Sequence, residues 1–340
     1  MSVLNKQILS AVLALGVSGG AAAQELNVYS SRHYQSDEAL YSGFTKLTAI
    51  KVNRIEAGED ALIERLRNEG SRSPADVLIT TDAGRLWRAQ QLGLLQPVRS
   101  ALLEERIPQS FREPARHWFG FSMRARVIAY NKNRVKPEEV ESYEALAEPK
   151  WKGRICVRSG THIYNLSLMS ALIEHQGEAK AEAWARAVKD NLARDPKGGD
   201  TDQIKGVAAG ECDVALANHY YYARLARSQK ADDRAVAEKV GLAFPGQSGT
   251  GTHVNISGAG VVRNAPHRDA AIRFLEYLAS DEAQRYFADG NNEWPVVASV
   301  RVDNPVLAHI GEIRYDPLNV SALGRSQAAA QRIFDRVGWK

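Results

Sequence analysis

The run FGFSMRARVIAY at residues 119–130 is the stretch that decides the fold of this chain. It has no turn signal in its middle and is rich in apolar residues, which is typical of a long extended strand. Such a strand can cross from one lobe of a protein to another. A second run, NISGAGVV at residues 255–262, predicts the return crossing. Two lobes joined by two crossing strands would enclose a cleft between them.

On both sides of the crossing run, strand patterns alternate with helix patterns. Residues 26–30 alternate as a strand, and the helix that follows has Ser36 as its expected N-cap. Strands and helices that alternate at this spacing predict an α/β fold with parallel sheets covered on both faces. The other expected strands are residues 51–57, 74–80, 154–158 and 213–217, and the other expected helices are residues 61–68, 83–91, 165–175 and 269–279.

The first 23 residues have the pattern of a signal peptide. Lys6 supplies the positive charge, residues 8–17 are apolar, and residues 21–23 are alanines. The apolar run is shorter than the roughly 20 residues that a transmembrane helix needs. We therefore expect that the signal peptide is cleaved after Ala23 and that the mature protein is located in the periplasm without insertion into a membrane.

The remaining length of about 317 residues exceeds one comfortable hydrophobic core, which favours two lobes. We expect a first lobe made of residues 24–125 and 250–300. The expected second lobe is made of residues 126–249 and is joined by the C-terminal segment, residues 301–340.

The charge and cysteine content limit the classes of partner. The net charge of +4 is spread with both signs interleaved, and the sequence has no basic stripe typical of nucleic-acid binding. The two cysteines, Cys156 and Cys212, favour one disulfide within one lobe in an oxidising compartment. Two separate buried thiols stay the alternative.

Tyrosine and histidine side chains cluster in three short segments that are far apart in the sequence. His33 and Tyr34 follow the first strand, whereas Tyr164 lies near the start of an expected helix. Tyr220 and Tyr221 follow a later strand. Open parallel sheets place ligands beyond the carboxyl ends of their strands, and phenolate with imidazole suits a hard cation such as Fe(III). We therefore predict a metal site to which each lobe contributes.

Deprotonation of these phenols must be driven, because free tyrosine has a pKa near 10. The bound ferric ion supplies most of that driving force. Asn218 is the expected N-cap of a helix that begins with Tyr220 and Tyr221, and a helix N-terminus also favours phenolate. Four phenolates around Fe(III) leave one negative charge, which Arg32 and Arg224 are expected to offset. Hard oxygen ligands argue against copper(I) and structural zinc.

The tyrosines could instead have a packing or sugar-binding role, and this interpretation stays open. A Tyr-Tyr pair is more often a packing contact or a platform for sugars than a metal site. Tyr41 and Tyr222 are expected to pack, and His162 and His219 are polar loop residues with no partner evident in the sequence. The combination of signal peptide, two-lobe pattern and strand-end clusters favours the metal site.

Several short motifs lie along the chain: VYSSRHY at residues 28–34, ADVL at 75–78, IYNLSL at 163–168, GECDVA at 210–215 and GAG at 258–260. Together with Asn218, Tyr220 and Tyr221, they resemble the periplasmic ferric-iron-binding proteins of ABC transporters, in particular their FutA-like, tyrosine-rich branch. The resemblance covers essentially the whole chain after residue 23. The chain departs from the pattern at His219, where a small polar residue is more usual, and at Tyr222.

The resemblance implies the type II periplasmic-binding fold, in which two α/β lobes close around the ligand. It implies Fe(III) as the transported ligand, without a synergistic anion, and delivery to an ABC permease with its ATPase. We also expect a monomer. The ligands that the motifs imply are His33, Tyr34, Tyr164, Tyr220 and Tyr221.

Two other functions stay open at this point. A protein of the same fold that binds an anion or a small organic ligand would use Arg32, Arg158 and Arg224. An enzyme with a tyrosine-ligated ferric centre is not favoured. The sequence has no Ser-His-Asp order, no H-E-x-x-H motif and no glycine-rich phosphate loop. We therefore expect that the protein is not an enzyme.

Overall fold

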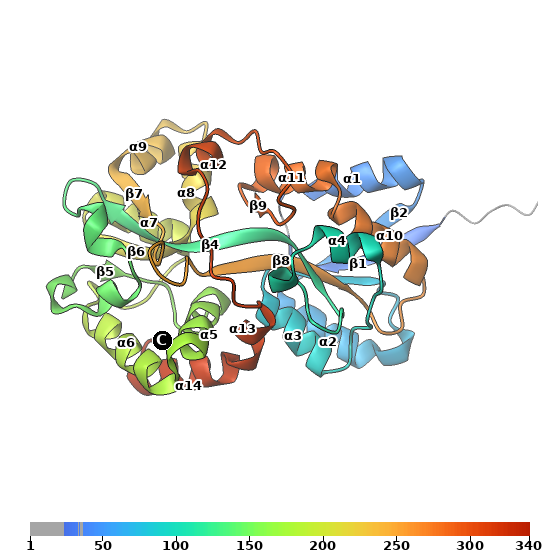
Figure 1. Cartoon of the computed structure of the whole chain (residues 1–340), viewed down its shortest axis with the longest axis horizontal. Helices are drawn as coiled ribbons and strands as arrows, with labels where there is room; N and C mark the ends of the chain where they lie inside the picture. Colours follow the sequence, from blue (N-terminus) through green and yellow to red (C-terminus); the bar gives the residue numbers. More distant parts are fainter. Residues whose placement is uncertain (1–23, 33, 35–36) are drawn as a thin grey trace, which may run out of the picture.

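The computed structural model describes residues 24–32, 34 and 37–340. Two α/β lobes lie side by side, and strands β4 and β8 run through the middle of the molecule (Figure 1). This arrangement confirms the predicted two-lobed α/β fold with two crossing strands. The signal peptide, its cleavage after Ala23, the expected N-cap Ser36 and the expected ligand His33 lie outside the described residues.

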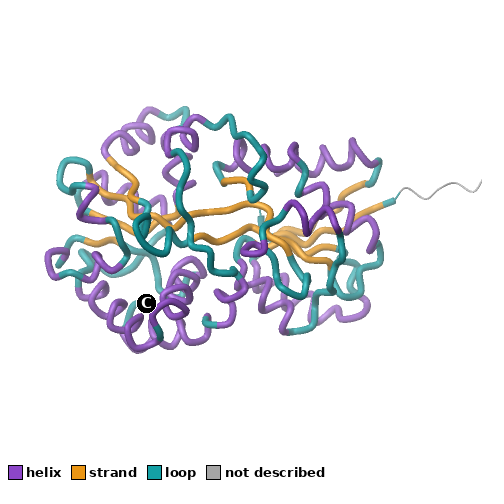
Figure 2. Tube along the Cα trace, in the orientation of Figure 1, coloured by secondary structure: helices purple, strands orange, loops and turns teal. Residues whose placement is uncertain are grey.

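The first lobe is built on a sheet with the strand order β2-β1-β3-β8-β4. Strand β1 pairs in parallel with β2 and with β3, as the alternating pattern predicted. Helices lie on both sides of this sheet, with its strands between them (Figure 2). The strands are β1 (Glu25–Ser30), β2 (Lys51–Glu56) and β3 (Val77–Thr80), and the helices are α1 (Asp37–Thr48), α2 (Glu59–Glu69), α3 (Ala83–Gln91), α4 (Ala101–Arg106), α10 (Arg268–Leu278) and α11 (Asp281–Asn291).

The crossing strands are β4 (Phe119–Asn131) and β8 (Val254–Val261). Residues 119–125 of β4 pair with β8, whereas residues 126–131 pair with strands of the second lobe. Strand β4 therefore changes sheets between Ala125 and Arg126. Both crossing strands are antiparallel to their neighbours, so the sheets are mixed rather than wholly parallel. Strand β4 carries the chain from the first lobe to the second and β8 carries it back, so the two strands run in opposite directions.

The second lobe repeats the alternation of strands and helices. Strand β5 is shorter than the predicted strand at residues 154–158, and it pairs in parallel with β6. The strands are β5 (Ile155–Cys156), β6 (Val214–Asn218) and β7 (Val240–Ala243), and the helices are α5 (Ile163–Gln176), α6 (Glu178–Asp190), α7 (Asp200–Ala209), α8 (His219–Ala226) and α9 (Ala231–Lys239). Short 3-10 helices lie at Gly70–Arg72, Gln109–Phe111, Pro137–Val140, Glu144–Ala147 and Pro149–Trp151.

The C-terminal segment touches both lobes. It contains α12 (Pro305–Ile310), α13 (Ser321–Arg325) and α14 (Gln327–Val337), and the short strand β9 (Trp294–Pro295) precedes it. Helix α13 packs against α3 and α5, and α14 packs against α5 and α6. The expected lobe boundaries stay a prediction, because β4 and the C-terminal segment belong to both lobes.

Each lobe has a hydrophobic core of its own. The core of the first lobe includes Trp118 and Phe274, and the core of the second includes Trp151 and Trp184. Tyr41 is buried in the first core with its ring stacked on Phe274, which confirms that it packs. Among the described residues, no helix is both long enough and apolar enough to cross a membrane.

Cys156 and Cys212 form a disulfide, which settles the alternative that the sequence left open. Cys156 lies in β5 and Cys212 follows α7, so the bridge joins two segments 56 residues apart. A cross-link of this kind lowers the entropy of the unfolded chain.

Replacing both cysteines by serine is expected to lower the free energy of unfolding by about 2–4 kcal/mol, because the loop that the bridge closes is long. Urea unfolding followed by circular dichroism measures this change. Wild-type protein unfolded in the presence of a reductant is the matched control, and its free energy of unfolding should fall by the same amount. An unchanged urea midpoint in both would contradict a stabilising bridge.

Candidate metal centre

The predicted tyrosines lie directly after strands or in the first turns of helices. Tyr34 follows β1, and Tyr164 lies in the first turn of α5. Strand β6 ends at Asn218, and α8 begins at the next residue, so that Tyr220 and Tyr221 lie in its first turn. The backbone therefore turns at the tyrosine pair, as predicted, and the two phenols do not point to opposite faces of a strand.

The phenols of Tyr34, Tyr164, Tyr220 and Tyr221 gather in one place between the lobes. The hydroxyl groups of Tyr164 and Tyr220 are 3.0 Å apart, and the ring centres of Tyr220 and Tyr221 are 4.3 Å apart. The guanidinium of Arg224 lies 4.5 Å from the ring centre of Tyr34, and 5.1 and 5.6 Å from those of Tyr220 and Tyr221. One first-lobe phenol and two second-lobe phenols thus surround the guanidinium of Arg224, and Tyr164 joins them through its contact with the hydroxyl group of Tyr220.

Burial decides the protonation state of the two most enclosed phenols. Burial, followed by the neighbouring phenol of Tyr221, raises the pKa of Tyr164 well above that of free tyrosine. Burial and the phenols of Tyr164 and Tyr34 raise the pKa of Tyr220 in the same way. Both phenols are therefore neutral at neutral pH, and a cation that binds them as phenolates must displace their protons.

Arg124, in the middle of β4, is a member of this site that the sequence analysis did not identify. Its side chain is buried, and it donates from Nη2 to the carbonyl of Ile256 at 2.7 Å. Within the described residues, its Nε and Nη1 have no hydrogen-bond partner. Burial opposes its charge, but Glu293 and the phenols of Tyr164 and Tyr220 hold the pKa of Arg124 above its ordinary value. Arg124 therefore places a positive charge beside the phenols.

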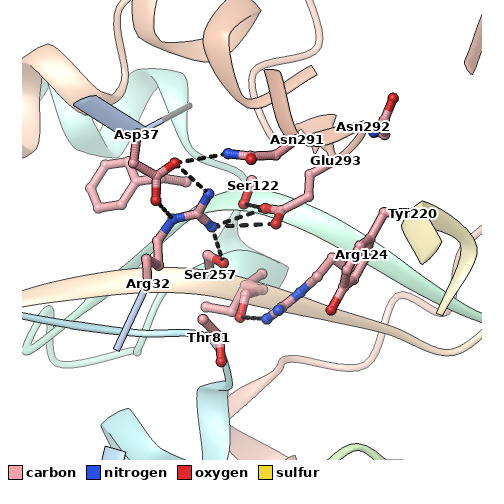
Figure 3. Close-up of polar contacts among 12 residues, drawn as sticks. Arg32, Asp37, Thr81, Ser122, Arg124, Tyr220, Ser257, Asn291, Asn292 and Glu293 are labelled. Carbon is pink, nitrogen blue, oxygen red and sulfur yellow. Dashed lines mark hydrogen bonds and ion pairs between the residues drawn. The ribbon is translucent and has the colours of Figure 1, made fainter. Parts of the chain in front are cut away.

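Arg32 is held in an ion-pair network at the base of the first-lobe half of the site (Figure 3). Its Nε and Nη2 donate to the carboxylate of Asp37 at 2.9 and 3.0 Å. Its Nη1 donates to Ser257 at 2.6 Å and to Glu293 at 3.1 Å. The guanidinium lies 5.0 Å from the ring centre of Tyr34. Because the carboxylates of Asp37 and Glu293 already pair with it, Arg32 positions this part of the site, and its expected role in offsetting the phenolate charge stays a prediction.

A second buried network holds the helices that carry the second-lobe tyrosines. Asp200 accepts hydrogen bonds from Arg126 at 2.6 Å, from Arg158 at 3.1 Å and from the backbone of Asn218 at 2.7 Å. Arg126 also donates to Asn165, which follows Tyr164, at 2.8 Å. Asn218 occupies the predicted N-cap position, but its side chain accepts from Arg126 instead of capping α8, because the buried guanidinium needs acceptors.

His162 has a structural partner that the sequence did not reveal. Its Nδ1 accepts a hydrogen bond from the backbone N–H of Tyr164 at 3.2 Å and so caps α5. Burial, followed by the charge of Arg158, lowers the pKa of His162 to about 3. The neutral imidazole therefore fixes the first turn of the helix in which Tyr164 lies.

A cavity of about 570 Å³ opens beside Tyr164. Its wall comes from both lobes, so it is part of the cleft that the two-lobed fold predicted. Within the described residues, no group of three or more His, Cys, Asp or Glu side chains could hold a metal ion. The cavity is lined by Ser31, Glu56, Ala57, Gly58, Glu59, Thr81, His162, Ile163 and Tyr164.

A buried carboxylate, that of Asp82, connects the two lobes near this cleft. Its Oδ1 caps α3 by accepting from the backbone of Gly84 at 2.7 Å. Its Oδ2 accepts from Ser167 of α5 at 2.8 Å and from Asn255 of β8 at 2.6 Å. Burial, followed by the nearby charge of Glu59, raises the pKa of Asp82 to about 7.

The pH dependence of stability is expected to change in Asp82→Asn. The raised pKa means that the folded protein binds this proton more tightly than the unfolded chain, so the contribution is complete below pH 3.8 and is lost as the pH rises through about 7. Across this window, the free energy of unfolding of wild type should fall by about 1.4 kcal/mol per pH unit relative to the variant. Urea unfolding at a series of pH values tests this. Asp269→Asn, at a fully exposed position, is the control, and a pH-independent difference for Asp82→Asn would contradict the assignment.

Comparison with known proteins decides the family. Residues 72–310 match the family described as bacterial extracellular solute-binding protein. The chain belongs to this family. The solute-binding protein is 53% identical over 336 residues to iron uptake protein A2 of Synechocystis sp., with 98% of this chain and 95% of that protein covered.

More distant relatives and solved structures agree with this family. The solute-binding protein is 28% identical over 340 residues to the major ferric iron-binding protein of Neisseria meningitidis serogroup B, with 99% of this chain and 100% of that protein covered. The structure of Trichodesmium FutA in complex with iron and citrate ligands matches with a TM-score of 0.90 and 57% identity, over 93% of this chain and 100% of that chain. The predicted family and fold are confirmed.

Proposed function

We propose that this solute-binding protein captures Fe(III) in the periplasm and delivers it, as a monomer, to an ABC permease with its ATPase. The observation that carries the proposal is the meeting of one first-lobe and three second-lobe phenols at a single point. The relatives named as iron uptake and ferric iron-binding proteins support it. The proposal assigns the protein no catalytic step.

In this proposal, Tyr34, Tyr164, Tyr220 and Tyr221 bind the ferric ion as phenolates, and His33 is a further ligand. Hard, anionic oxygen donors favour a small trivalent cation over softer metals. Arg124 and Arg224 offset the negative charge that four phenolates leave on the complex. No synergistic anion is needed, because the phenolates already outnumber the charges on the ion.

Binding is coupled to the loss of protons from the phenols. Tyr164 and Tyr220 are neutral in the iron-free protein because of their raised pKa values, so iron must release their protons. Ferric affinity therefore rises with pH. Since Tyr34 belongs to the first lobe and the other phenols to the second, separation of the lobes at the permease would divide the ligand set and release the ion.

The alternative of an anion-binding protein receives less support. Two of the three arginines that it requires, Arg32 and Arg158, are ion-paired to buried carboxylates. Arg32 faces two carboxylates, which offset its charge, and Arg158 shares the carboxylate of Asp200 with Arg126.

The test is a titration of iron-stripped protein with ferric citrate, followed by visible absorption. We expect a saturable phenolate-to-iron charge-transfer band at one equivalent, together with thermal stabilisation. Ga(III), which has no such band, should give the stabilisation alone. No band and no stabilisation with either metal, but saturable heat with phosphate or sulfate in calorimetry, would replace the ferric function by anion binding.

A further inference from the structure

His219 differs from the polar loop residue that the sequence predicted. It is the first residue of α8, directly before Tyr220, and its side chain is fully buried. The backbone N–H of Ala125 donates to its Nδ1, so this nitrogen carries no proton and the imidazole is neutral. A neutral imidazole has one donor and one acceptor nitrogen, and both are used here.

The two ring nitrogens of His219 bind two segments outside its own helix. Its Nδ1 accepts from the backbone N–H of Ala125 at 3.2 Å. Because Nδ1 accepts, Nε2 carries the proton and donates to the carbonyl of Asn292 at 2.8 Å. The ring also stacks on Trp294, with 3.9 Å between the ring centres. Ala125 is the residue at which β4 leaves the first-lobe sheet, so His219 ties α8 to the crossing point.

Asn292 and its neighbours belong to the side of the molecule that carries Tyr34. Asn292 is the C-cap of α11, which packs against α1 of the first lobe. The next residue, Glu293, binds Arg32, which lies beside Tyr34 (Figure 3). The segment at residues 291–294 is therefore in contact with both halves of the candidate metal centre.

The other end of α8 is attached to the same residue. Arg227, at the C-cap of α8, donates to the side-chain oxygen of Asn292 at 2.7 Å and to the carbonyl of Asp289 at 2.8 Å. Asn304 also donates to the side chain of Asn292, at 2.8 Å. Helix α8 is thus anchored at both ends to the C-terminus of α11.

We infer that His219 is a positioning residue for the metal centre: it fixes the first turn of α8, and with it Tyr220 and Tyr221, relative to the crossing strand and to the half-site of Tyr34. This inference rests on the proposed ferric function. The physical reason is that each of its two hydrogen bonds ends on a backbone group, so the start of α8 cannot shift without leaving these groups unpaired.

The decisive comparison is His219→Phe against His219→Gln. Phenylalanine keeps an aromatic ring for Trp294 but leaves the N–H of Ala125 and the carbonyl of Asn292 without partners. Glutamine keeps one donor and one acceptor. We expect His219→Phe to weaken ferric binding about tenfold or more and to shift or reduce the charge-transfer band, and His219→Gln to stay within about threefold of wild type. Tyr222→Phe, which removes a hydrogen bond from the same helix to Ala237, is the matched control and should bind like wild type.

Amide hydrogen exchange of the iron-free protein tests the anchor without iron. Exchange at Ala125 and in the first turn of α8 should become faster in His219→Phe and stay near the wild-type rate in His219→Gln. If His219→Phe does not fold, Arg227→Met, at an exposed position, should accelerate exchange at the end of α8 and weaken ferric binding by a smaller factor.

Two results would overturn the inference. The first is a folded His219→Phe protein with wild-type exchange, band and affinity. The second is an equal loss of ferric affinity in His219→Phe and His219→Gln, which would show that the two hydrogen bonds of His219 do not position the metal centre. A wild-type protein that gives no band would instead refute the proposed ferric function, and the exchange data would still decide the role of His219.

Discussion

Replacing Tyr220 and Tyr221 together by phenylalanine is expected to abolish most of the charge-transfer band and to weaken ferric binding by more than about a hundredfold. Groups outside the coordination sphere of a metal already cost about 10–100-fold when they are removed, and these phenols are proposed as direct ligands. The rings remain, so the contact between them at 4.3 Å is kept and only the donor oxygens are lost. Competition with citrate, followed by visible absorption, measures the loss.

Tyr222→Phe provides the control for this experiment, because its hydroxyl group binds the carbonyl of Ala237 and does not reach the phenol cluster. It should retain the band and the affinity of wild type. If the double variant is folded and keeps wild-type ferric affinity, the assignment of these two tyrosines as ligands is wrong.

Asp200→Asn is expected to lower the free energy of unfolding by about 3–5 kcal/mol, because it leaves the charge of the buried Arg126 without a counter-ion. Arg158 loses the same partner. The amide also offers fewer acceptor sites than the carboxylate, which serves three donors. Urea unfolding compared with wild type measures this loss, and the iron-bound protein should show a weaker band because Tyr164 and Tyr220 flank the damaged network.

The matched control lies on the same helix and uses the same substitution. Asp202 is exposed to solvent and accepts from the backbone of Gly199 at the start of α7. Asp202→Asn should cost only about 1 kcal/mol or less, the usual scale of a cap. Equal losses in the two variants would show that the buried ion pairs of Asp200 contribute no more than a surface cap.

Local sequence signals were sufficient for the parts of the fold that depend on neighbouring residues. The run at residues 119–130, which has no turn signal, predicted β4, and Asn218 as an expected N-cap predicted that a helix would carry Tyr220 and Tyr221. The antiparallel pairing of β8 was not predicted, because pairing depends on which strands meet in space. Residue spacing alone carries no information on that.

The charges around the site were predicted less well. Arg32 is expected to offset phenolate charge because it adjoins the cluster of His33 and Tyr34 in the sequence, but it also pairs with Glu293, which lies 261 residues away. Arg124 was not predicted as a site residue, because the groups around it, Ile256 and Glu293 among them, are also distant in the sequence. The available signal was the pair Arg124 and Arg126 in an otherwise largely apolar strand. Alternate residues of a strand share one face, and a buried charge requires a counter-ion or hydrogen-bond partners. The sequence predicts a polar loop residue at His219, but in the structure this residue begins α8 and its side chain is buried.

The position of β8 within the first-lobe sheet sets an order for the assembly of the molecule during synthesis. This strand, Val254–Val261, lies between β3 and β4, so the sheet that begins with the first strands of the chain has an unpaired edge at β3 until residue 261 has been made. The segment that contains Cys156 and Cys212 is contiguous and is complete earlier. The core of the second lobe is nevertheless completed later still, because Ile333, Phe334 and Trp339 near the C-terminus belong to it. Exposed strand edges are sites of aggregation, so the incomplete chain is most in need of a chaperone until β8 has paired with β3 and the C-terminal helix has packed.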